Sequence, residues 1–373
     1  MKYIVQICRV IVGIIFILSG FVKAIDPIGF SYKLEEYFAP DVFNIQFLHD
    51  LALPQATFFS IFEIILGVFL LLGIFKKFTN WSLLILIVFF TFLTFYSAYF
   101  NKVTDCGCFG DAMKLTPWQS FWKDIFLLIL IIIIFIGQKH IKPLIEKSKV
   151  SFAISAVVLF LCGWLAFTGI KYLPIIDFRA YAEGKNITEG MKSAEELGLD
   201  PPKYQVLYTM KNKKTGEVVQ ITDTEYTDNV KWYEEGTPWE MDSEKTESKQ
   251  ISAGYEPPIH DFILDCDGED KTEFYLNEQK VVFFLIPFAE KLTAEEINIL
   301  NKLYKELEGK ANVAVLTNSD IENAGFAYCY VDQTQLKTII RNNPGIMTVK
   351  KGTVVKKFHD NPIPSSEEIL SSF

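Results

Sequence analysis

Two cysteines separated by one residue are the clearest chemical feature of this sequence. Residues 105–111 read Asp-Cys-Gly-Cys-Phe-Gly-Asp, so Cys106 and Cys108 flank a glycine that permits the bend needed to join their sulfurs. A bridge across so small a ring is strained, and strained exposed disulfides are the more oxidising, labile ones. The pair is therefore a candidate for thiol–disulfide exchange. The alternatives are a static disulfide that pins the loop and two reduced thiols packed under Phe109.

Ionisable residues within apolar stretches are the second chemical feature. Arg9, Lys23, Glu63 and Asp124 fall inside or near segments apolar enough to cross a bilayer, where charged side chains are costly and usually paired or functional. Arg9 is long enough to reach Glu63, and Lys23 lies at a depth similar to that of Asp124. The pattern indicates either a proton path or polar quinone pocket that serves the cysteine loop, or a structural ion pair that holds the helices together.

Neither a metal site nor a nucleic-acid interface is expected. The chain has four histidines, none of them near the cysteine loop, so the loop lacks the ligands of a closed metal site. The net charge of −9 and the lack of lysine and arginine clusters argue against nucleic acid as a partner.

Five apolar segments must position these residues. Hydrophobic residues make up 50% of the chain despite its net charge of −9, because nearly all the long apolar runs precede residue 174. About 20 apolar residues are needed to cross a bilayer. Five segments meet this length, which predicts five transmembrane helices in a lipid bilayer, near 4–22, 55–75, 81–100, 118–136 and 151–171.

The charged residues between these segments predict the orientation. Loops on the side of the N-terminus hold seven lysines and one acid, whereas the opposite loops hold four lysines and seven acids. Positive charge is retained in the cytoplasm. We therefore expect a bacterial inner-membrane protein with a cytoplasmic N-terminus, a periplasmic cysteine loop and a periplasmic C-terminal domain.

The region after the fifth span predicts a β-rich insert at residues 175–254. Residues 204–222 have the pattern of a hairpin with its turn at 213–216. Trp232 and Trp239 indicate further strands.

Residues 255–373 predict an α/β domain. Strands and helices alternate and end in an antiparallel hairpin, an order that favours a sheet with helices on its faces. Thr293, three residues before Glu296, is a capping signal for the first of these helices. The expected elements are strands at 281–286 and 312–317, helices at 293–307 and 333–341, and a hairpin of 346–350 with 353–358.

The membrane half resembles the DoxX/MauE family of redox-associated membrane proteins. The resemblance covers about residues 1–140, and the Cys-Gly-Cys-Phe-Gly loop is its most specific part. The other matching features are Ser19-Gly20-Phe21-Val22-Lys23, Asp26-Pro27, Glu63 before Leu66-Gly67, and Trp118 with Asp124. This resemblance implies a four-helix membrane domain associated with periplasmic disulfide formation, protein maturation or quinone-linked sulfur oxidation. Residues 141–174, which contain the fifth span, and the long C-terminal region resemble an arrangement found in Bacteroidota.

Residues 255–373 resemble a thioredoxin-like domain of the peroxiredoxin or cytochrome-maturation type. The resemblance rests on Pro258-Ile-His-Asp-Phe262 with Asp267-Gly268, and on Asn343-Pro344-Gly345, which is similar to the cis-proline segment of that group. Where the family places Cys-x-x-Cys, this chain has Pro287-Phe-Ala-Glu-Lys291. The resemblance therefore implies a partner-binding surface that includes Pro287, Asn343 and Pro344, without dithiol chemistry of its own.

These features favour an inner-membrane protein that supports periplasmic thiol–disulfide chemistry or protein maturation. In this interpretation Cys106 and Cys108 exchange a disulfide with a periplasmic or membrane partner protein, which the cysteine-less domain docks. Electrons would leave to a membrane quinone or a second oxidoreductase. The rival interpretation is a non-catalytic assembly or scaffold subunit whose cysteine bridge is structural. Cys266 and Cys329 could form a further bridge, a question that the sequence leaves open.

Overall fold

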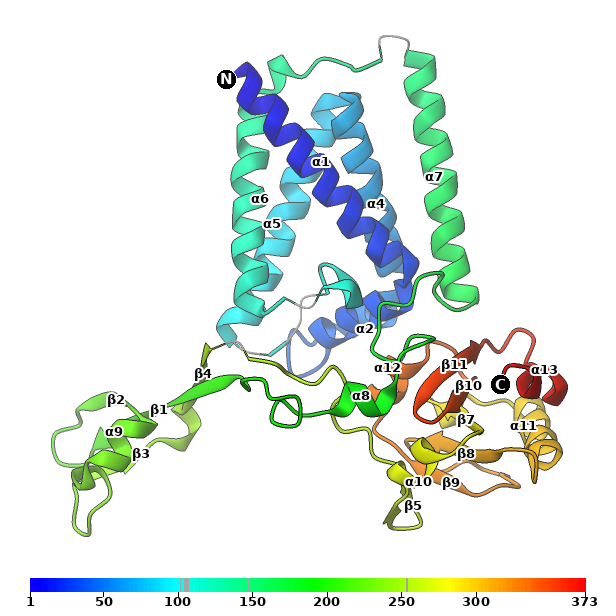
Figure 1. Ribbon diagram of the computed structural model, residues 1–373. Helices are drawn as coiled ribbons and strands as arrows, with labels where there is room; N and C mark the ends of the chain where they lie inside the picture. Colours follow the sequence, from blue (N-terminus) through cyan, green and yellow to red (C-terminus); the bar gives the residue numbers. More distant parts are fainter. Residues whose placement is uncertain (101, 104–106, 114, 146–147, 253) are drawn as a thin grey trace. The chain divides into compact units, whose positions relative to one another are not determined.

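The computed structural model describes residues 1–373 except 101, 104–106, 114, 146–147 and 253 (Figure 1). The chain folds as two compact units, one of Met1–Lys185 with Ile263–Phe373 and the other of Asn186–Phe262. The first unit contains a helical membrane part and a mixed sheet with helices. The second unit is a small β-rich insert. This architecture confirms the predicted fold class.

Five long apolar helices form the membrane part, as predicted. Each is long and apolar enough to cross a bilayer. Helix α1 packs against α4, α6 and α7, while α5 packs mainly on α6. The helices are α1 (Lys2–Ile25), α4 (Ala52–Leu72), α5 (Lys76–Phe100), α6 (Pro117–Ile136) and α7 (Ser148–Lys171).

Glycines allow α1 and α4 to approach closely. A Cβ atom on Gly20 of α1 would lie 2.6 Å from the carbonyl oxygen of Ser60 on α4. A Cβ atom on Gly67 of α4 would lie 2.8 Å from the carbonyl oxygen of Gly13. Small residues at such crossings let two backbones come together. The polar residues next to Gly20 on α1 therefore lie beside those of α4.

Short helices surround one end of the bundle. Helix α2 (Pro27–Phe38) begins at Asp26, whose carboxylate accepts a hydrogen bond of 2.8 Å from Gly29 N, with Pro27 at the first helical position. A Cβ atom on Gly107, in the cysteine loop, would lie 3.0 Å from Lys33 Cγ of α2, so this loop lies against α2. The other short helices at this end are α3 (Gln46–Asp50) and η1 (Gly110–Ala112), whereas η2 (Gln138–His140) lies at the opposite end, where Gln6 of α1 donates a hydrogen bond to His140 O.

The β-rich unit is a four-stranded antiparallel sheet. The predicted hairpin is confirmed as β1 (Lys203–Asn212) and β2 (Val218–Thr222), and β1 also pairs with β3 and β4. Trp239 lies on a strand as expected, but the strand predicted at Trp232 is wrong. The Trp232 ring lies 4.9 Å from the Trp239 ring and is buried in the core, although its backbone forms a 3-10 turn. A buried aromatic residue therefore does not require a strand here. The remaining elements are α8 (Ile187–Met191), α9 (Asp223–Asp228), η3 (Val230–Trp232), β3 (Trp239–Met241), η4 (Ser243–Lys245) and β4 (Glu247–Ser252).

A seven-stranded sheet forms the C-terminal domain, in the order β11-β10-β7-β8-β9-β5-β6. Strand β7 is parallel to β8, and β10 is antiparallel to both β7 and β11. All six residues of β7 are buried, which explains its uninterrupted apolar sequence. The strands are β5 (Asp265–Cys266), β6 (Glu269–Asp270), β7 (Val281–Ile286), β8 (Asn312–Thr317), β9 (Tyr328–Tyr330), β10 (Gly345–Lys350) and β11 (Thr353–Phe358).

Helices pack on this sheet largely as predicted. Thr293 and Glu296 form the expected capping box of α11. Helix α12 ends at Ile339 rather than at Arg341, because Ile340 adopts extended backbone and buries its side chain completely. The strand order and the helices confirm an α/β domain, and the peptide bond between Asn343 and Pro344 is cis. The helices are α10 (Thr272–Asn277), η5 (Ala289–Lys291), α11 (Ala294–Leu307), α12 (Gln333–Ile339) and α13 (Ser366–Ser371).

Candidate functional site

Cys108 lies in a tight turn between α5 and α6. It is disulfide-bonded and 9% exposed. Gly107, just before it, has a φ of 65°, a conformation that glycine adopts at little cost. A side chain at position 107 would also contact Lys33 of α2. The backbone conformation and the limited space thus both explain why glycine lies between the two cysteines. Cys106 lies outside the described residues, so the Cys106–Cys108 pairing stays a prediction.

Lys23 of α1 and Glu63 of α4 form a buried ion pair. Lys23 Nζ lies 2.5 Å from Glu63 Oε1, and both side chains are 3% exposed. The ammonium also lies 5.0 Å from the ring centroids of Phe30 and Phe90. Burying two charges in a membrane protein is costly. The attraction between Lys23 and Glu63 at this short distance offsets that cost.

Asp124 of α6 forms a second pair within the same bundle. Its Oδ1 atom lies 2.9 Å from Lys123 Nζ, and Thr94 Oγ1 of α5 donates a hydrogen bond of 3.0 Å to Oδ2. Asp124 is almost fully buried. Lys123 Nζ lies 5.2 Å from the ring centroid of Phe109, the residue after Cys108. This pair therefore lies next to the cysteine loop.

Both ion pairs and Cys108 line one small cavity. It measures about 30 Å³, which is room for one or two water molecules but not for a quinone ring. With two lysines and two carboxylates ionised, the site has no net charge. Its lining residues are Ile15, Phe16, Ser19, Lys23, Phe30, Glu63, Ile87, Phe90, Cys108, Lys123, Asp124 and Leu127.

Ser19 connects the ion pairs to the cysteine loop. Its Oγ atom lies 2.8 Å from Glu63 Oε2 and 2.9 Å from the carbonyl oxygen of Cys108. A hydroxyl carries one proton and cannot donate to both oxygens at once. The single hydroxyl proton therefore goes either to Glu63 or to the Cys108 carbonyl, and Ser19 lies between Glu63 and the backbone of the cysteine loop.

Arg9 does not join this site, and the predicted reach to Glu63 is wrong. Its guanidinium donates to the carbonyl oxygens of Leu70 at 2.7 Å, Leu71 at 2.6 Å and Lys142 at 3.2 Å. Helix ends leave such carbonyls without intrahelical partners. Arg9 satisfies those at the end of α4, so its contacts are those of a helix cap.

The predicted partner-binding residues lie together in the C-terminal domain. Asn343 accepts a hydrogen bond from Phe288 N through Oδ1 and donates one to Phe288 O through Nδ2, both at 3.0 Å. This exchange ties the segment after β7 to the segment before β10. Pro287 and Pro344 are both buried.

A buried charge cluster joins the end of α7 to the same domain. Asp177 Oδ2 lies 2.9 Å from Lys357 Nζ on β11, and Asp177 Oδ1 accepts from Arg179 Nε at 2.6 Å. Burial alone would raise the pKa of Asp177, but Arg179 and Lys357 lower it to about 2. Burial lowers the pKa of Lys357 to about 7, assisted by Arg179 and opposed by Asp177. The segment after α7 is therefore fastened to the edge strand of the sheet.

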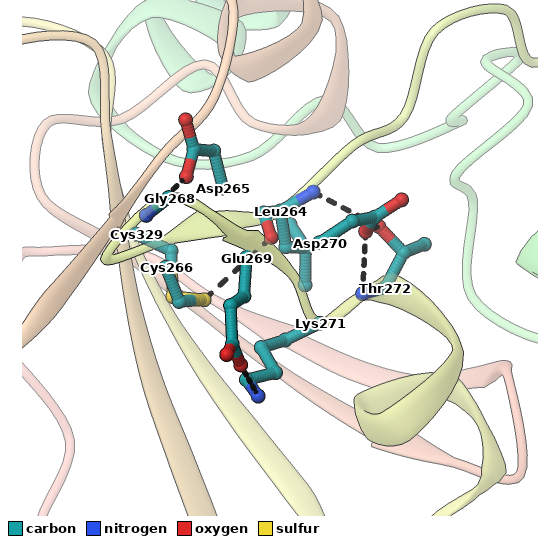
Figure 2. The surroundings of a disulfide bond; sticks show 9 residues. All are labelled: Leu264, Asp265, Cys266, Gly268, Glu269, Asp270, Lys271, Thr272 and Cys329. Atoms are coloured by element: carbon teal, nitrogen blue, oxygen red, sulfur yellow. Dashed lines mark hydrogen bonds and ion pairs between the residues drawn. A yellow bond between two sulfur atoms is a disulfide. The ribbon is translucent and has the colours of Figure 1, made fainter.

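A second disulfide joins Cys266 of β5 to Cys329 of β9, which answers the question of their pairing (Figure 2). The adjoining turn is held by local hydrogen bonds. Gly268 N donates to Asp265 Oδ1 and Thr272 N donates to Asp270 Oδ1, both at 2.9 Å. The bridge therefore ties together two strands of one sheet.

Several residues with structural contacts to the predicted site residues or to the cysteine loop were not predicted as site residues, among them Ser19, Lys123 and Arg341. Ser19 lies four residues before Lys23, so helical spacing could have placed both on one face of α1. Lys123 is next to Asp124 in sequence. Arg341, which pairs with Asp26, has no local signal because these residues are 315 positions apart.

Comparison with known proteins supports the membrane half. Residues 1–137 match the family described as methylamine utilisation protein MauE. Protein TlpB of Flavobacterium psychrophilum is 28% identical over 147 residues, a match that covers 36% of this chain and 37% of that protein. The matched segment thus spans little more than a third of this curated relative, and no solved structure matches the chain. The predicted family is confirmed for the membrane half: residues 1–137 form a MauE family domain.

Proposed function

We propose that this protein is a bacterial inner-membrane component of periplasmic thiol–disulfide chemistry or protein maturation. The MauE domain and the five apolar helices support a membrane location. The lysine-rich loops on the side of the N-terminus support a cytoplasmic N-terminus and a periplasmic cysteine loop. The Cys266–Cys329 disulfide supports a periplasmic C-terminal domain, because disulfides persist in oxidising compartments.

One observation carries the proposal: a disulfide-bonded cysteine shares a buried cavity with two ion pairs. Cys108 and the charged residues Lys23, Glu63 and Asp124 all line this cavity. A disulfide that serves only to pin a loop needs no buried charges beside it. Buried charges in a bundle are costly and mark functional sites.

The proposed reaction is disulfide exchange between the loop and a partner protein. A thiolate of the partner attacks one sulfur of the Cys106–Cys108 bridge, so a mixed disulfide forms and the other loop sulfur leaves as a thiolate. A second partner thiolate then attacks the mixed disulfide. The partner gains a disulfide, and the loop becomes a dithiol that holds two electrons. A membrane quinone or the disulfide of a second oxidoreductase would accept those electrons and restore the bridge.

The polar membrane site would handle the protons of this cycle. Reduction of a disulfide to a dithiol takes up two protons, and reoxidation releases them. Glu63 and Asp124 line the same cavity as Cys108, which has room for water. Ser19 contacts the Cys108 carbonyl and not its sulfur, so its role would be to position the loop. The half-buried Asn343 would contribute to the surface that docks the partner protein, and the buried Pro287 and Pro344 would support that surface from beneath.

A scaffold role is the second candidate function, and the charge pairing favours it. Lys23 and Lys123 each have a carboxylate within 3 Å; the Lys23–Glu63 pair would hold α1 to α4, and the hydrogen bond from Thr94 to Asp124 would hold α5 to α6. In that case the disulfide of Cys108 would be structural. The two candidates differ in the redox properties they require of the loop.

The deciding experiment is the midpoint potential of the loop cysteines. The full-length protein would be equilibrated in graded dithiol buffers, trapped with a thiol reagent and analysed in a C266S/C329S background. A potential above roughly −230 mV supports disulfide exchange, whereas a value below about −300 mV supports a structural bridge. If the protein carries out disulfide exchange, replacement of Cys106 and Cys108 by serine should abolish that exchange without lowering the amount of protein in the cell. Loss of the protein itself would favour the scaffold.

A further inference from the structure

Arg341 of the C-terminal domain forms two ion pairs with the membrane part of the same unit. Its Nε atom lies 2.8 Å from Asp26 Oδ2, and its Nη2 atom lies 2.8 Å from Asp111 Oδ2. The Arg341 side chain is 5% exposed. Burial alone would lower the pKa of Arg341, but Asp26 and Asp111 raise it. The guanidinium therefore stays charged between two carboxylates.

These two carboxylates belong to the elements that hold the cysteine loop. Asp26 is the N-cap of α2, against which the loop lies. Asp111 is in η1, three residues after Cys108. Arg341, in turn, lies two residues before Asn343 in the segment that precedes β10. One arginine thus joins the cysteine loop to the predicted partner-binding segment.

The first turn of α2 is shaped to receive this arginine. A Cβ atom on Gly29 would lie 2.6 Å from Arg341 Nη2 and 2.5 Å from Asp26 Oδ2. Any side chain at this position would displace the guanidinium or the carboxylate. Gly29 has ordinary helical backbone, so conformational freedom does not explain the glycine. The room it leaves is filled by Arg341.

The surrounding surfaces carry opposite charges. Lys337 Nζ and the Arg341 guanidinium lie 4.9 Å and 5.6 Å from the ring centroid of Tyr32 on α2. Burial raises the pKa of Tyr32 to about 12. Burial also raises the pKa of Glu35, while Lys337 and Lys291 of the C-terminal domain oppose this shift. Acidic residues of α2 thus face basic residues of the other domain.

The connection after α7 restricts where the domain can lie. Arg179 donates to the carbonyl oxygen of Thr338 at 3.3 Å, and Lys357 donates to that of Ile339 at 2.7 Å. Tyr181 donates to Gln335 at 2.9 Å. These contacts fasten the end of α12 to a segment that begins directly after the last membrane helix. A short segment after α7 therefore keeps the region that contains Arg341 close to the membrane part.

We propose that the face of the C-terminal domain around Arg341 and Lys337 is a docking surface for the membrane domain of the same chain. Its target is the acidic side of α2 together with Asp111. This proposal refines the proposed function and rests on it for its consequence: a partner protein that reaches the loop must displace or share the Arg341 contact. The domain then controls access to the loop as well as docking the partner.

Crosslinking tests the docking without using the loop cysteines. In a C106S/C108S background, Y32C and K337C would be introduced, with a protease site at the exposed 213–216 turn of the full-length protein. A short bifunctional maleimide should keep the two protease fragments together on a denaturing gel. R341E should lower the crosslinking yield about tenfold, because a buried charge pair is replaced by repulsion. K305E, the same charge change on the exposed face of α11, should leave the yield unchanged.

Gly29 provides a second variant that leaves Arg341 in place. G29A should raise the helix propensity of α2 yet lower the crosslinking yield, because its methyl group would occupy the position of the guanidinium. Equal yields in the parent, R341E and G29A would overturn the proposal, as would no crosslink in the parent. Since this assay lacks Cys106 and Cys108, its failure would not bear on the midpoint potential, which tests the proposed function.

Discussion

The membrane domain and the C-terminal domain each hold a disulfide-bonded cysteine and a cluster of buried charges, but they arrange them differently. In the membrane domain, Cys108 lines the same cavity as Lys23, Glu63 and Asp124. In the C-terminal domain, the Cys266–Cys329 bridge joins β5 to β9. In the buried Asp177–Lys357 pair, Lys357 lies on β11, at the other end of the strand order, and Asp177 lies in the segment after α7.

The surroundings of the two disulfides differ in solvent as well as in charge. Glu269 and Lys271, beside the Cys266–Cys329 bridge, form an ion pair with side chains 69% and 42% exposed, so water screens their charges (Figure 2). The charges beside Cys108 are buried and act at short range in a medium of low polarity. A disulfide in the first setting ties strands together. A disulfide in the second setting can have its reduction coupled to proton binding.

The largest expected effect is the loss of the C-terminal bridge. The cysteines are 63 residues apart, and closing a loop of this length removes enough entropy from the unfolded chain to stabilise the fold by about 4 kcal/mol. C266S/C329S should lower the unfolding free energy of the domain by this amount, measured by hydrogen exchange of β8 and β9 amides. The midpoint potential of the loop cysteines should not change. A shift in that potential would contradict the separation of the two disulfides.

Breaking the Lys23–Glu63 pair should have the next largest effect. E63Q leaves the Lys23 ammonium buried without its carboxylate, which should cost about 3 kcal/mol, and K23M/E63Q should recover most of this loss. Denaturation of the detergent-solubilised chain would measure both. E36Q provides the matched control, because its Lys33–Glu36 pair is partly exposed and should contribute less than about 1 kcal/mol. Equal stability of E63Q and the parent would show that the pair contributes nothing.

Asp177 should make the C-terminal domain sensitive to acid. Its pKa of about 2 lies below the ordinary 3.8, so the folded state binds this proton less tightly than the unfolded state. The resulting stability, about 2 kcal/mol, is present above pH 4 and is lost as the pH falls towards 2. D177N should remove it, which hydrogen exchange of β11 amides at pH 3 to 6 would detect. A parent as stable at pH 2.5 as at pH 5 would contradict this assignment.

Local signals made most of the fold predictable. The five spans and β7 are continuous apolar runs, and α11 has both an amphipathic pattern and its own capping residues. Trp232 was misplaced because a large aromatic residue can fill a core from a turn as well as from a strand. The predicted helix extended to Arg341, two residues too far. Ile340 leaves the helix to bury its side chain against the sheet, and the local sequence does not reveal that contact.

The site was predictable in its members but not in its contacts. Hydropathy alone identifies Lys23, Glu63 and Asp124 as charges within apolar segments. Which charge pairs with which depends on how each helix is rotated and where two helices cross. The crossing at Gly20 places Lys23 beside Glu63 and leaves Arg9 at the far end of α4. Arg341 meets Asp26 only through the tertiary fold, and no spacing rule predicts such a contact.

The smallest expected effect tests the link that distinguishes the two disulfides. S19A removes the hydroxyl between the buried Glu63 and the Cys108 carbonyl, whereas the hydrogen-bond chain to Cys266 in Figure 2 starts from the exposed Asp270 and runs through Thr272 and Leu264. A neutral hydrogen bond contributes about 1 kcal/mol, which for a two-electron couple corresponds to about 20 mV. S19A should therefore shift the midpoint potential of the loop cysteines by about 20 mV, because the loop no longer contacts Glu63 through this hydroxyl. S60A offers a matched control on the same helix interface, since its hydroxyl donates to Ala56 of its own helix. Equal midpoint potentials in S19A and S60A would mean that the buried charges stabilise the bundle without acting on the disulfide, and the two disulfides would then be alike in function.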